Sequence, residues 1–238
     1  MARRALVLVH ESDNGAGQIE CRLVERGFEV DHHLITPDRD RPDSAAPWPS
    51  VVGYDLLVPM GSIRSLTDTS PISSWIDNEL RMIRDAHDAG TAILGICFGG
   101  QLIAEALGGS VETAPVTEIG WYELSDGPGG TNPVGAGPWM AWHHDRISPP
   151  PCADVLAETA DAVQLIRAGT TVGTQFHPEV DGAHVAGWLA NASDDYLAEY
   201  GVSREQMLAD ANAHEARNIE QCHALVDWFL DEVAFPAG

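Results

Sequence analysis

The sequence predicts an α/β fold with helices on both faces of a mostly parallel sheet. Short apolar runs alternate with longer stretches of helical spacing, and each early run leads into a turn that contains glycine. In the second half the runs follow one another at hairpin distance, which indicates a partly antiparallel extension of the sheet. The 238 residues can bury one sizeable core, so we expect one domain with a helical appendage.

The first half supplies the expected parallel strands and the helices between them. Residues 5–9, 55–58 and 91–96 are compact apolar runs, as strands buried on both faces are. Residues 17–26 and 71–89 have helical spacing, because their apolar side chains recur at intervals of three and four.

The second half predicts shorter strands, loops and a helical end. The expected strands cover residues 120–124, 140–143, 155–157, 162–167 and 171–176. Loops rich in proline or glycine are expected over residues 39–50 and 125–138, and helices over residues 183–190 and 204–233. We divide the chain into a first domain, residues 1–190, and a C-terminal helical extension, residues 191–238, packed on the same domain.

The charge balance excludes several function classes. The chain has 13 basic and 36 acidic side chains, a net charge of −23, and every basic residue is Arg. Such a field repels nucleic acids and anionic membranes, so we expect neither as a partner. Without Lys there is no Schiff-base or P-loop lysine. No apolar run approaches the roughly 20 residues that span a bilayer. Four widely spaced cysteines argue against a disulfide framework and favour the cytoplasm.

The strongest local motif is Gly-Ile-Cys-Phe-Gly-Gly-Gln at residues 95–101. It joins a buried strand to a helix that begins near Phe98, as in a nucleophile elbow with cysteine in place of serine. Gly95 and Gly99 lack Cβ atoms, so strand and helix can approach closely around Cys97. The helix N-terminus then places peptide N–H groups beside the sulfur. The alternative, an ordinary buried cysteine, explains neither flanking glycine.

A second motif offers a base and a group to orient it. In Gln-Phe-His-Pro-Glu, at residues 175–179, His177 and Glu179 are two positions apart at the end of a predicted strand. This spacing directs both side chains the same way, so the carboxylate can bond one imidazole nitrogen while the other faces the sulfur. Alone, the pair would be a loop histidine beside a surface Glu; with the elbow it predicts a triad.

Together the two motifs resemble those of the class I, triad-type glutamine amidotransferases, over roughly residues 5–190. The resemblance implies a flavodoxin-like three-layer α/β sandwich and a catalytic domain at residues 1–190. It also implies that Cys97 is the nucleophile, His177 the general base and acid, and Glu179 the orienting carboxylate. The reaction implied is attack on a γ-carboxamide, release of ammonia and hydrolysis of a γ-glutamyl thioester.

Weaker matches imply the remaining site residues. The family's oxyanion hole corresponds to the backbone N–H groups of Gly61 and Phe98, although the chain has Pro-Met-Gly where adjacent glycines are more usual. The orientation of the Gly61 amide in the resting state is therefore open. Gln101, His143 and Asp145 correspond to residues on the substrate side.

We expect no metal and no cofactor. His143 and His144 adjoin Asp145, and a second His-His pair occurs at residues 32–33. Adjacent histidines suit neither one helix face nor one strand face, so pocket-rim histidines that bond the backbone are the stronger interpretation.

Three functions remain open. The motifs Thr-Glu-Ile-Gly-Trp, Gly-Ile-Cys-Phe-Gly-Gly-Gln and Trp-His-His-Asp look closest to stand-alone GMP-synthase-like glutamine amidotransferases. The first hypothesis is a glutaminase that supplies ammonia to a separate synthase or acceptor subunit. The second is a γ-glutamyl peptidase or hydrolase that uses the same thioester. The third, a non-catalytic subunit, conflicts with the intact triad.

Overall fold

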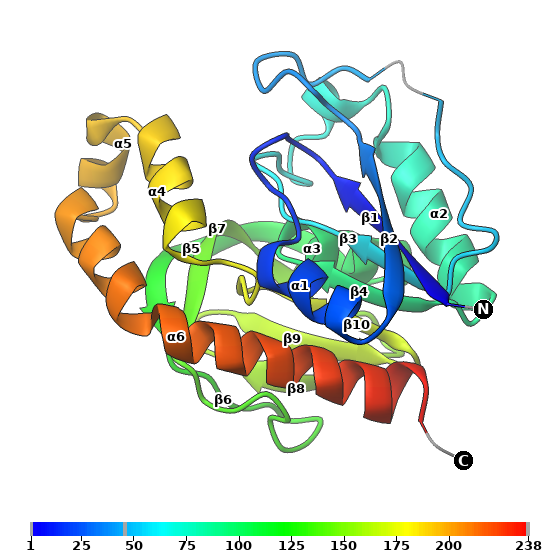
Figure 1. The fold of residues 1–238 in the computed structure, drawn as a ribbon. Helices are drawn as coiled ribbons and strands as arrows, with labels where there is room; N and C mark the ends of the chain where they lie inside the picture. Colours follow the sequence, from blue (N-terminus) through cyan, green and yellow to red (C-terminus); the bar gives the residue numbers. More distant parts are fainter. Residues whose placement is uncertain (1, 45–46, 237–238) are drawn as a thin grey trace.

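The computed structural model, which describes residues 2–44 and 47–236, has a central sheet between layers of helices (Figure 1). Its main sheet has the strand order β2-β1-β3-β4-β10-β9-β8-β6. Neighbours from β2 to β10 are parallel, and β9, β8 and β6 continue the sheet antiparallel. The strands of this sheet are β1 Arg3–Val9, β2 Phe28–Leu34, β3 Leu56–Pro59, β4 Ala92–Ile96, β6 Ser125–Asp126, β8 Asp154–Glu158, β9 Val163–Ala168 and β10 Thr171–Thr174.

Two further strands form a separate antiparallel ribbon. These are β5, Ser110–Tyr122, and β7, Trp139–Ser148, whose pairing shifts register between Thr113 and Glu118. The backbone N–H of His177 donates to the Met140 carbonyl at 2.7 Å, which ties the ribbon to the segment after β10. The ribbon therefore forms a wall beside the carboxyl ends of β4 and β10.

The helices cover both faces of the main sheet. Figure 1 shows α1 and α6 on one side of the sheet and α2 and α3 on the other. The helices are α1 Gly17–Glu25, a 3-10 turn at Ser70–Ile72, α2 Ile76–Asp88, α3 Phe98–Ala106, α4 Gly182–Asn191, α5 Asp194–Glu199 and α6 Arg204–Trp228, which continues as a π-helix over Phe229–Ala234. In the part of the chain that the structure describes, no helix is long and apolar enough to cross a membrane.

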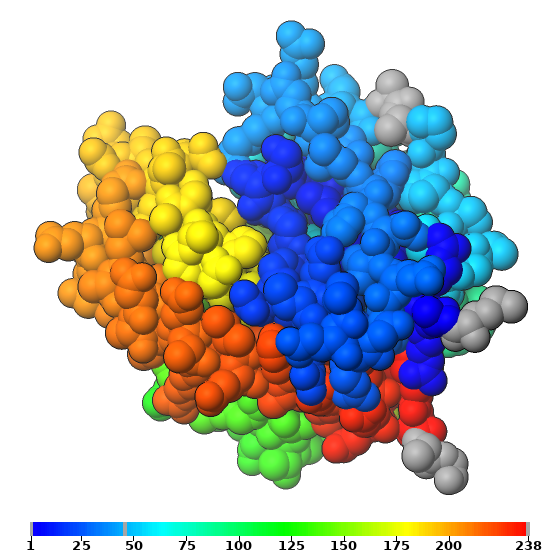
Figure 2. Space-filling model, viewed as in Figure 1, coloured from blue at the N-terminus to red at the C-terminus, as the bar shows by residue number. Residues whose placement is uncertain are grey.

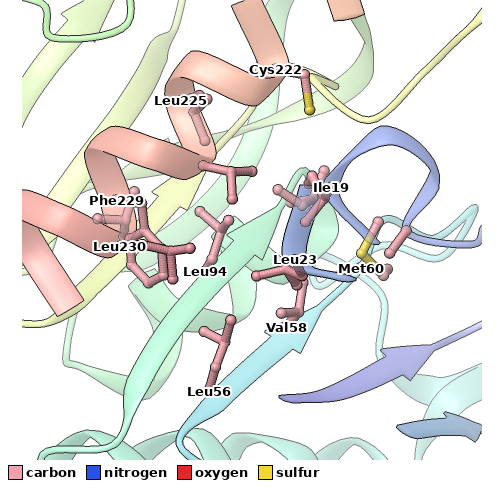
Figure 3. Close-up of a cluster of buried hydrophobic side chains, with 14 of the residues drawn as sticks. Ile19, Leu23, Leu56, Val58, Met60, Leu94, Cys222, Leu225, Phe229 and Leu230 are labelled. Carbon is pink, nitrogen blue, oxygen red and sulfur yellow. The ribbon is translucent and has the colours of Figure 1, made fainter. Parts of the chain in front are cut away.

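Two hydrophobic cores lie on opposite faces of the sheet. Along β1, Ala5, Val7 and Val9 belong to one core and Leu6 and Leu8 to the other, as the two-residue period of a doubly covered strand requires. Figure 3 shows the first core, where α1 and α6 pack on β3 and β4. Its labelled side chains are Ile19, Leu23, Leu56, Val58, Met60, Leu94, Cys222, Leu225, Phe229 and Leu230. Because α6 buries side chains in this core, the C-terminal helix is part of the body of the protein.

The predicted fold class is confirmed, with several corrections to its elements. The stretch 71–89 is two pieces, a 3-10 turn and α2, because the chain turns between Ile72 and Ile76 to bury Ile72 and Trp75. The strands predicted at 120–124 and 140–143 are longer and form their own ribbon. The loop predicted at 125–138 begins with the short strand β6, and the strand predicted at 171–176 ends at Thr174.

Two elements were not predicted individually, although the second lies within the predicted helical extension. The strand β2 lies at the edge of the sheet and buries only Phe28 fully, so its sequence has no apolar run. The short helix α5 begins after the Ser193 cap and also lacks an apolar run. The described part of the predicted loop 39–50 has no helix or strand, and residues 45–46 lie outside the described residues. The boundary at residue 190 stays a prediction.

Candidate active site

Cys97 lies on a tight turn between β4 and α3. Its backbone has φ 50° and ψ −102°, and in residues 2–44 and 47–236 no other residue except glycine has positive φ. A Cβ atom on Gly95 would lie 2.6 Å from the Gly99 carbonyl oxygen, and one on Gly99 would lie 2.0 Å from the Pro59 carbonyl oxygen. Both glycines are therefore needed for the close approach of strand, helix and the neighbouring β3. The sulfur is held at the carboxyl edge of the sheet, beside the start of α3.

His177 and Glu179 form the predicted hydrogen-bonded pair. The His177 Nδ1 atom lies 2.8 Å from Glu179 Oε1, and both side chains are buried. The segment that carries them follows β10 and is fixed by Asn218 of α6, whose amide donates to the carbonyl oxygens of Pro178 and Val180 at 3.2 and 2.7 Å. The sequence gave no signal for Asn218, because it lies about forty positions away in a helix predicted only as an extension.

The electrostatics favour a charged His177. Burial alone would lower its pKa, but the negative charges of Glu179 and of a Cys97 thiolate outweigh burial and raise the pKa to about 10. The side chains of Cys97 and His177 lie close together beside Gly61. A Cβ atom there would lie 3.0 Å from His177 Cε1 and 3.8 Å from Cys97 Cβ. The arrangement can therefore hold a thiolate against an imidazolium.

The two predicted oxyanion donors lie next to this pair. Gly61 follows β3, and the carbonyl of the preceding Met60 accepts from the Gly99 N–H at 3.1 Å. Phe98 is the first residue of α3, where peptide N–H groups have no partner within the helix. Among the described residues, no acceptor bonds the N–H of Gly61 or of Phe98. Both groups are therefore free to bind an oxygen atom.

Two buried side-chain amides form a chain of contacts that leads to Cys97. Gln175 Nε2 is 3.6 Å from Cys97 Sγ, and its Oε1 accepts from Gln101 Nε2 at 3.2 Å. The same Gln101 nitrogen is 3.4 Å from the Asp145 carbonyl oxygen. Gln101, expected on the substrate side, thus lines the pocket while its amide bonds protein groups. The motif Gln-Phe-His-Pro-Glu contained Gln175, but nothing in its spacing indicated contact with the sulfur.

His143 and Asp145 lie on one face of β7, at the pocket. His143 Nδ1 is 3.0 Å from the Asp145 carbonyl oxygen, and its Nε2 is 2.9 Å from Glu118 of β5. The Asp145 carboxylate accepts from Ser65 Oγ at 2.5 Å. His144 faces the other way, toward Tyr196 Oη at 2.7 Å. In the described part of the chain, no three His, Cys, Asp or Glu side chains are grouped to hold a metal ion.

A pocket of about 700 Å³ opens over Cys97 and His177. One wall is aromatic: Trp142 and Trp188 meet at 89°, and Trp188 lies 4.7 Å from the His177 ring. Trp142 Nε1 donates to Tyr196 Oη at 2.9 Å, and the two rings are parallel within 7°. Figure 2 shows the yellow surface of α4, which carries Trp188, beside the blue N-terminal segments that supply Asn14 to the pocket. The sequence did not predict this wall, which depends on α4 and α5 folding over the ribbon.

Comparison with known proteins agrees with this geometry. Residues 13–191 match the family model described as glutamine amidotransferase class-I. The glutamine amidotransferase-like protein YfeJ of Salmonella typhimurium is 28% identical, over 97% of both chains. A GMP synthase of Caldanaerobacter subterraneus subsp. tengcongensis is 36% identical over 56% of this chain, which spans 28% of that enzyme. A solved glutamine amidotransferase from Thermotoga maritima shares the fold, with a TM-score of 0.82, 22% identity and coverage of 98% and 100% of the two chains.

Proposed function

The chain belongs to the class I glutamine amidotransferase family, and we propose that it hydrolyses the side-chain amide of glutamine through a Cys97 γ-glutamyl thioester. The observation that carries the proposal is the hydrogen-bonded His177–Glu179 pair, which meets Cys97 on its turn beside two free peptide N–H groups. A nucleophile, a base, an orienting group and oxyanion donors are the parts that acyl transfer requires.

In the first half-reaction, the Cys97 thiolate attacks the carboxamide carbon and forms a carbon–sulfur bond. The oxyanion that develops accepts hydrogen bonds from the N–H groups of Gly61 and Phe98. As the carbon–nitrogen bond breaks, the His177 imidazolium gives its proton to the departing nitrogen. Ammonia leaves, and the γ-glutamyl thioester remains beside a neutral His177.

In the second half-reaction, neutral His177 takes a proton from water as its oxygen attacks the thioester carbonyl. The second oxyanion uses the same two donors, and its collapse releases glutamate and restores the thiolate. Glu179 fixes the tautomer of the imidazole by accepting from Nδ1, so Nε2 faces the reaction. Glutamine and water are converted to glutamate and ammonia, with the enzyme unchanged.

The substrate's amino-acid end is assigned to the β7 side of the pocket. Asp145 is an acidic group at this wall, held by Ser65, and its carboxylate suits the α-ammonium group. His143 and Gln101 both bond the Asp145 carbonyl, so they would shape this wall. Ammonia then passes to a separate synthase or acceptor subunit, a role consistent with a chain that matches only part of a GMP synthase.

The second candidate function is hydrolysis of γ-glutamyl amides with larger leaving groups. The leaving group must lie near His177, which protonates it, and there the pocket is walled by Trp188, Trp142 and Tyr196. Ammonia is too small and polar to gain from contact with aromatic side chains. An amine with an apolar or aromatic side chain would bury surface against them. This observation favours a γ-glutamyl dipeptide as an additional substrate.

One experiment tests both functions. We would assay the protein with glutamine, γ-glutamylglycine and γ-glutamylphenylalanine, using Cys97→Ser as the inactive control. Undiminished turnover by Cys97→Ser would contradict the assignment of Cys97 as the nucleophile. Activity that appears only after a partner protein is added would show that this chain is a subunit that depends on that partner. The γ-glutamyl peptidase function predicts a higher kcat/KM for γ-glutamylphenylalanine than for γ-glutamylglycine. This preference should be lost in Tyr196→Ala and kept in Tyr200→Ala. Tyr200 is the matched control because it contacts Tyr196 but does not line the pocket.

A further inference from the structure

A buried ion pair, His10 and Glu79, lies beneath the catalytic turn and has no role in the proposed reaction. His10 follows β1, Glu79 belongs to α2, and neither side chain is exposed to solvent. His10 Nε2 lies 3.1 Å from both carboxylate oxygens of Glu79, and His10 Nδ1 lies 3.2 Å from the carbonyl oxygen of Gly61. Burying two ionisable groups is unfavourable unless their hydrogen bonds are satisfied. The burial of His10 and Glu79 therefore calls for a structural or functional explanation.

The two contacts of His10 define its protonation. Each ring nitrogen faces an oxygen that can only accept, a peptide carbonyl on one side and a carboxylate on the other. The imidazolium, with a proton on both nitrogens, is the form that donates to both. Burial lowers the His10 pKa, but attraction to Glu79, with a smaller contribution from Glu11, raises it overall. The bond to Gly61 is therefore charge-assisted.

His10 contacts both residues assigned to the oxyanion hole. Besides its bond to Gly61, its ring packs edge-to-face against Phe98, with ring centroids 5.0 Å apart and an angle of 83°. Trp75 closes the other side of the ring at 5.6 Å. One side chain thus connects the loop after β3 to the first residue of α3.

The Gly61 N–H belongs to the Met60–Gly61 peptide, and the Gly61 carbonyl belongs to the next peptide, so each peptide beside Gly61 needs its own restraint. On one side, the Met60 carbonyl accepts from the Gly99 N–H at 3.1 Å. On the other side, the Gly61 carbonyl accepts from His10 at 3.2 Å. Glycine has the widest backbone freedom of any residue, so without the second bond the Gly61–Ser62 peptide could rotate and the chain at Gly61 could shift. The first bond restrains the peptide that carries the Gly61 N–H, and the second holds the chain on the other side of Gly61, beside Cys97 and His177.

We propose that His10 and Glu79 are positioning residues, which hold the chain at Gly61 in place so that its N–H stays at the oxyanion hole. The proposal rests on the proposed amide hydrolysis. It explains why a histidine and a glutamate are buried together below the catalytic turn, 69 positions apart in the chain. It also explains how Pro-Met-Gly can form an oxyanion hole: His10, which directly follows β1, supplies the restraint.

The test compares two reactions of the same sulfur. Hydrolysis of glutamine needs the oxyanion hole, whereas alkylation of Cys97 by iodoacetamide displaces iodide and forms no oxyanion. We would measure kcat and KM for glutamine, and the alkylation rate of the Cys97 peptide by mass spectrometry. The variants are His10→Leu, His10→Asn and Glu79→Gln, with His33→Leu, a partly buried histidine on β2, as the control. Thermal melts would establish that each variant is folded.

His10→Leu is expected to lower kcat by about 10- to 100-fold, somewhat less than the loss of a donor itself, with little change in KM or alkylation rate. His10→Asn should recover most of kcat, because its amide nitrogen can donate near the position of Nδ1. The kcat of Glu79→Gln should lie between those of His10→Leu and His10→Asn. If His10→Leu does not fold, Glu79→Gln and His10→Asn together test the proposal. Unchanged kcat in the folded variants, or an equal loss of kcat and alkylation, would overturn the proposal. Wild-type protein without glutaminase or γ-glutamyl activity would overturn the proposed function and this inference with it.

Discussion

The charge on His177 depends on the carboxylate beside it. Burial opposes the imidazolium, yet Glu179 and the Cys97 thiolate together raise the pKa to about 10. In the proposed reaction, this imidazolium would supply the proton that the departing nitrogen needs. A buried Glu that accepts from Nδ1 both orients the ring and maintains its charge.

We therefore predict different losses of kcat when His177 and Glu179 are substituted. His177→Ala removes the acid and base, and Glu179→Gln removes only the charge and part of the orientation, so His177→Ala should lose about 10- to 100-fold more kcat. Because the carboxylate raises the His177 pKa, its removal should move the alkaline loss of activity to lower pH. A pH profile of kcat/KM for glutamine from pH 6 to 10.5 measures both effects. Equal losses, or an alkaline limb that stays in place, would contradict these roles.

Gln175 offers a second test at the residue scale. Its buried amide donates toward Cys97 Sγ and accepts from Gln101, so it can orient the sulfur and stabilise negative charge that develops on it. Gln175→Leu should slow iodoacetamide alkylation of Cys97 at pH 7 by about 3- to 10-fold, the equivalent of ~1 kcal/mol. Gln101→Leu is the matched comparison and should have a smaller effect, because its amide does not touch the sulfur. Peptide mapping separates Cys97 from the exposed Cys21 and Cys152. An unchanged rate would exclude this role.

Among the elements, α6 connects the C-terminal part of the chain to the segment that carries His177 and Glu179. It packs on α1 through the first core, and its buried Asn218 bonds two carbonyls of the segment that carries Glu179. The helix thus sets the position of the orienting carboxylate without touching the pocket.

We expect Asn218→Leu to lower kcat for glutamine by about 5- to 50-fold and to destabilise the protein by about 1–3 kcal/mol. Two buried carbonyls would lose their donor, and the backbone around Glu179 could shift. The matched control is Asn212→Leu, the same change at an exposed position of α6, which should alter neither quantity appreciably. Steady-state kinetics and urea unfolding provide the measurements. Full activity in Asn218→Leu would show that α6 has no part in positioning Glu179.

An element could be predicted from the sequence where its pattern lies within a few neighbouring residues, and could not where it depends on distant contacts. The strands β1, β3 and β4 are buried on both faces, so their apolar runs are continuous and unambiguous. The edge strand β2 and the first half of β5 expose most of their side chains, and no apolar pattern marks them. The same limit holds for the site. The elbow and the His177–Glu179 pair are encoded in a few adjacent residues, whereas Asn218, the aromatic wall and the His10–Glu79 pair depend on contacts across the fold.

For the whole molecule, the net charge of −23 is a problem of stability. Arg residues neutralise some local clusters of acidic side chains. Arg22 pairs with Asp227 where α1 meets α6, and Arg26 pairs with Asp231 just beyond the ends of these helices. Such partly exposed pairs contribute little each, and the large acidic excess remains. Repulsion among these charges favours expansion of the chain, and the folded state must overcome it.

Salt should therefore stabilise this protein at neutral pH. Raising NaCl from about 20 mM to about 500 mM shortens the Debye length to a few Å, and we expect it to relieve repulsion by about 1–2 kcal/mol, a rise in Tm of ~2–8 °C. At pH 5 the net charge is much smaller, because the pI is about 4.5, so the rise should be smaller there. Ion-specific effects on apolar burial act at both pH values, so the difference between them isolates the charge effect. Differential scanning calorimetry at the two pH values measures it. A fall in Tm at pH 7, or an equal rise at both pH values, would show that the acidic excess does not limit stability.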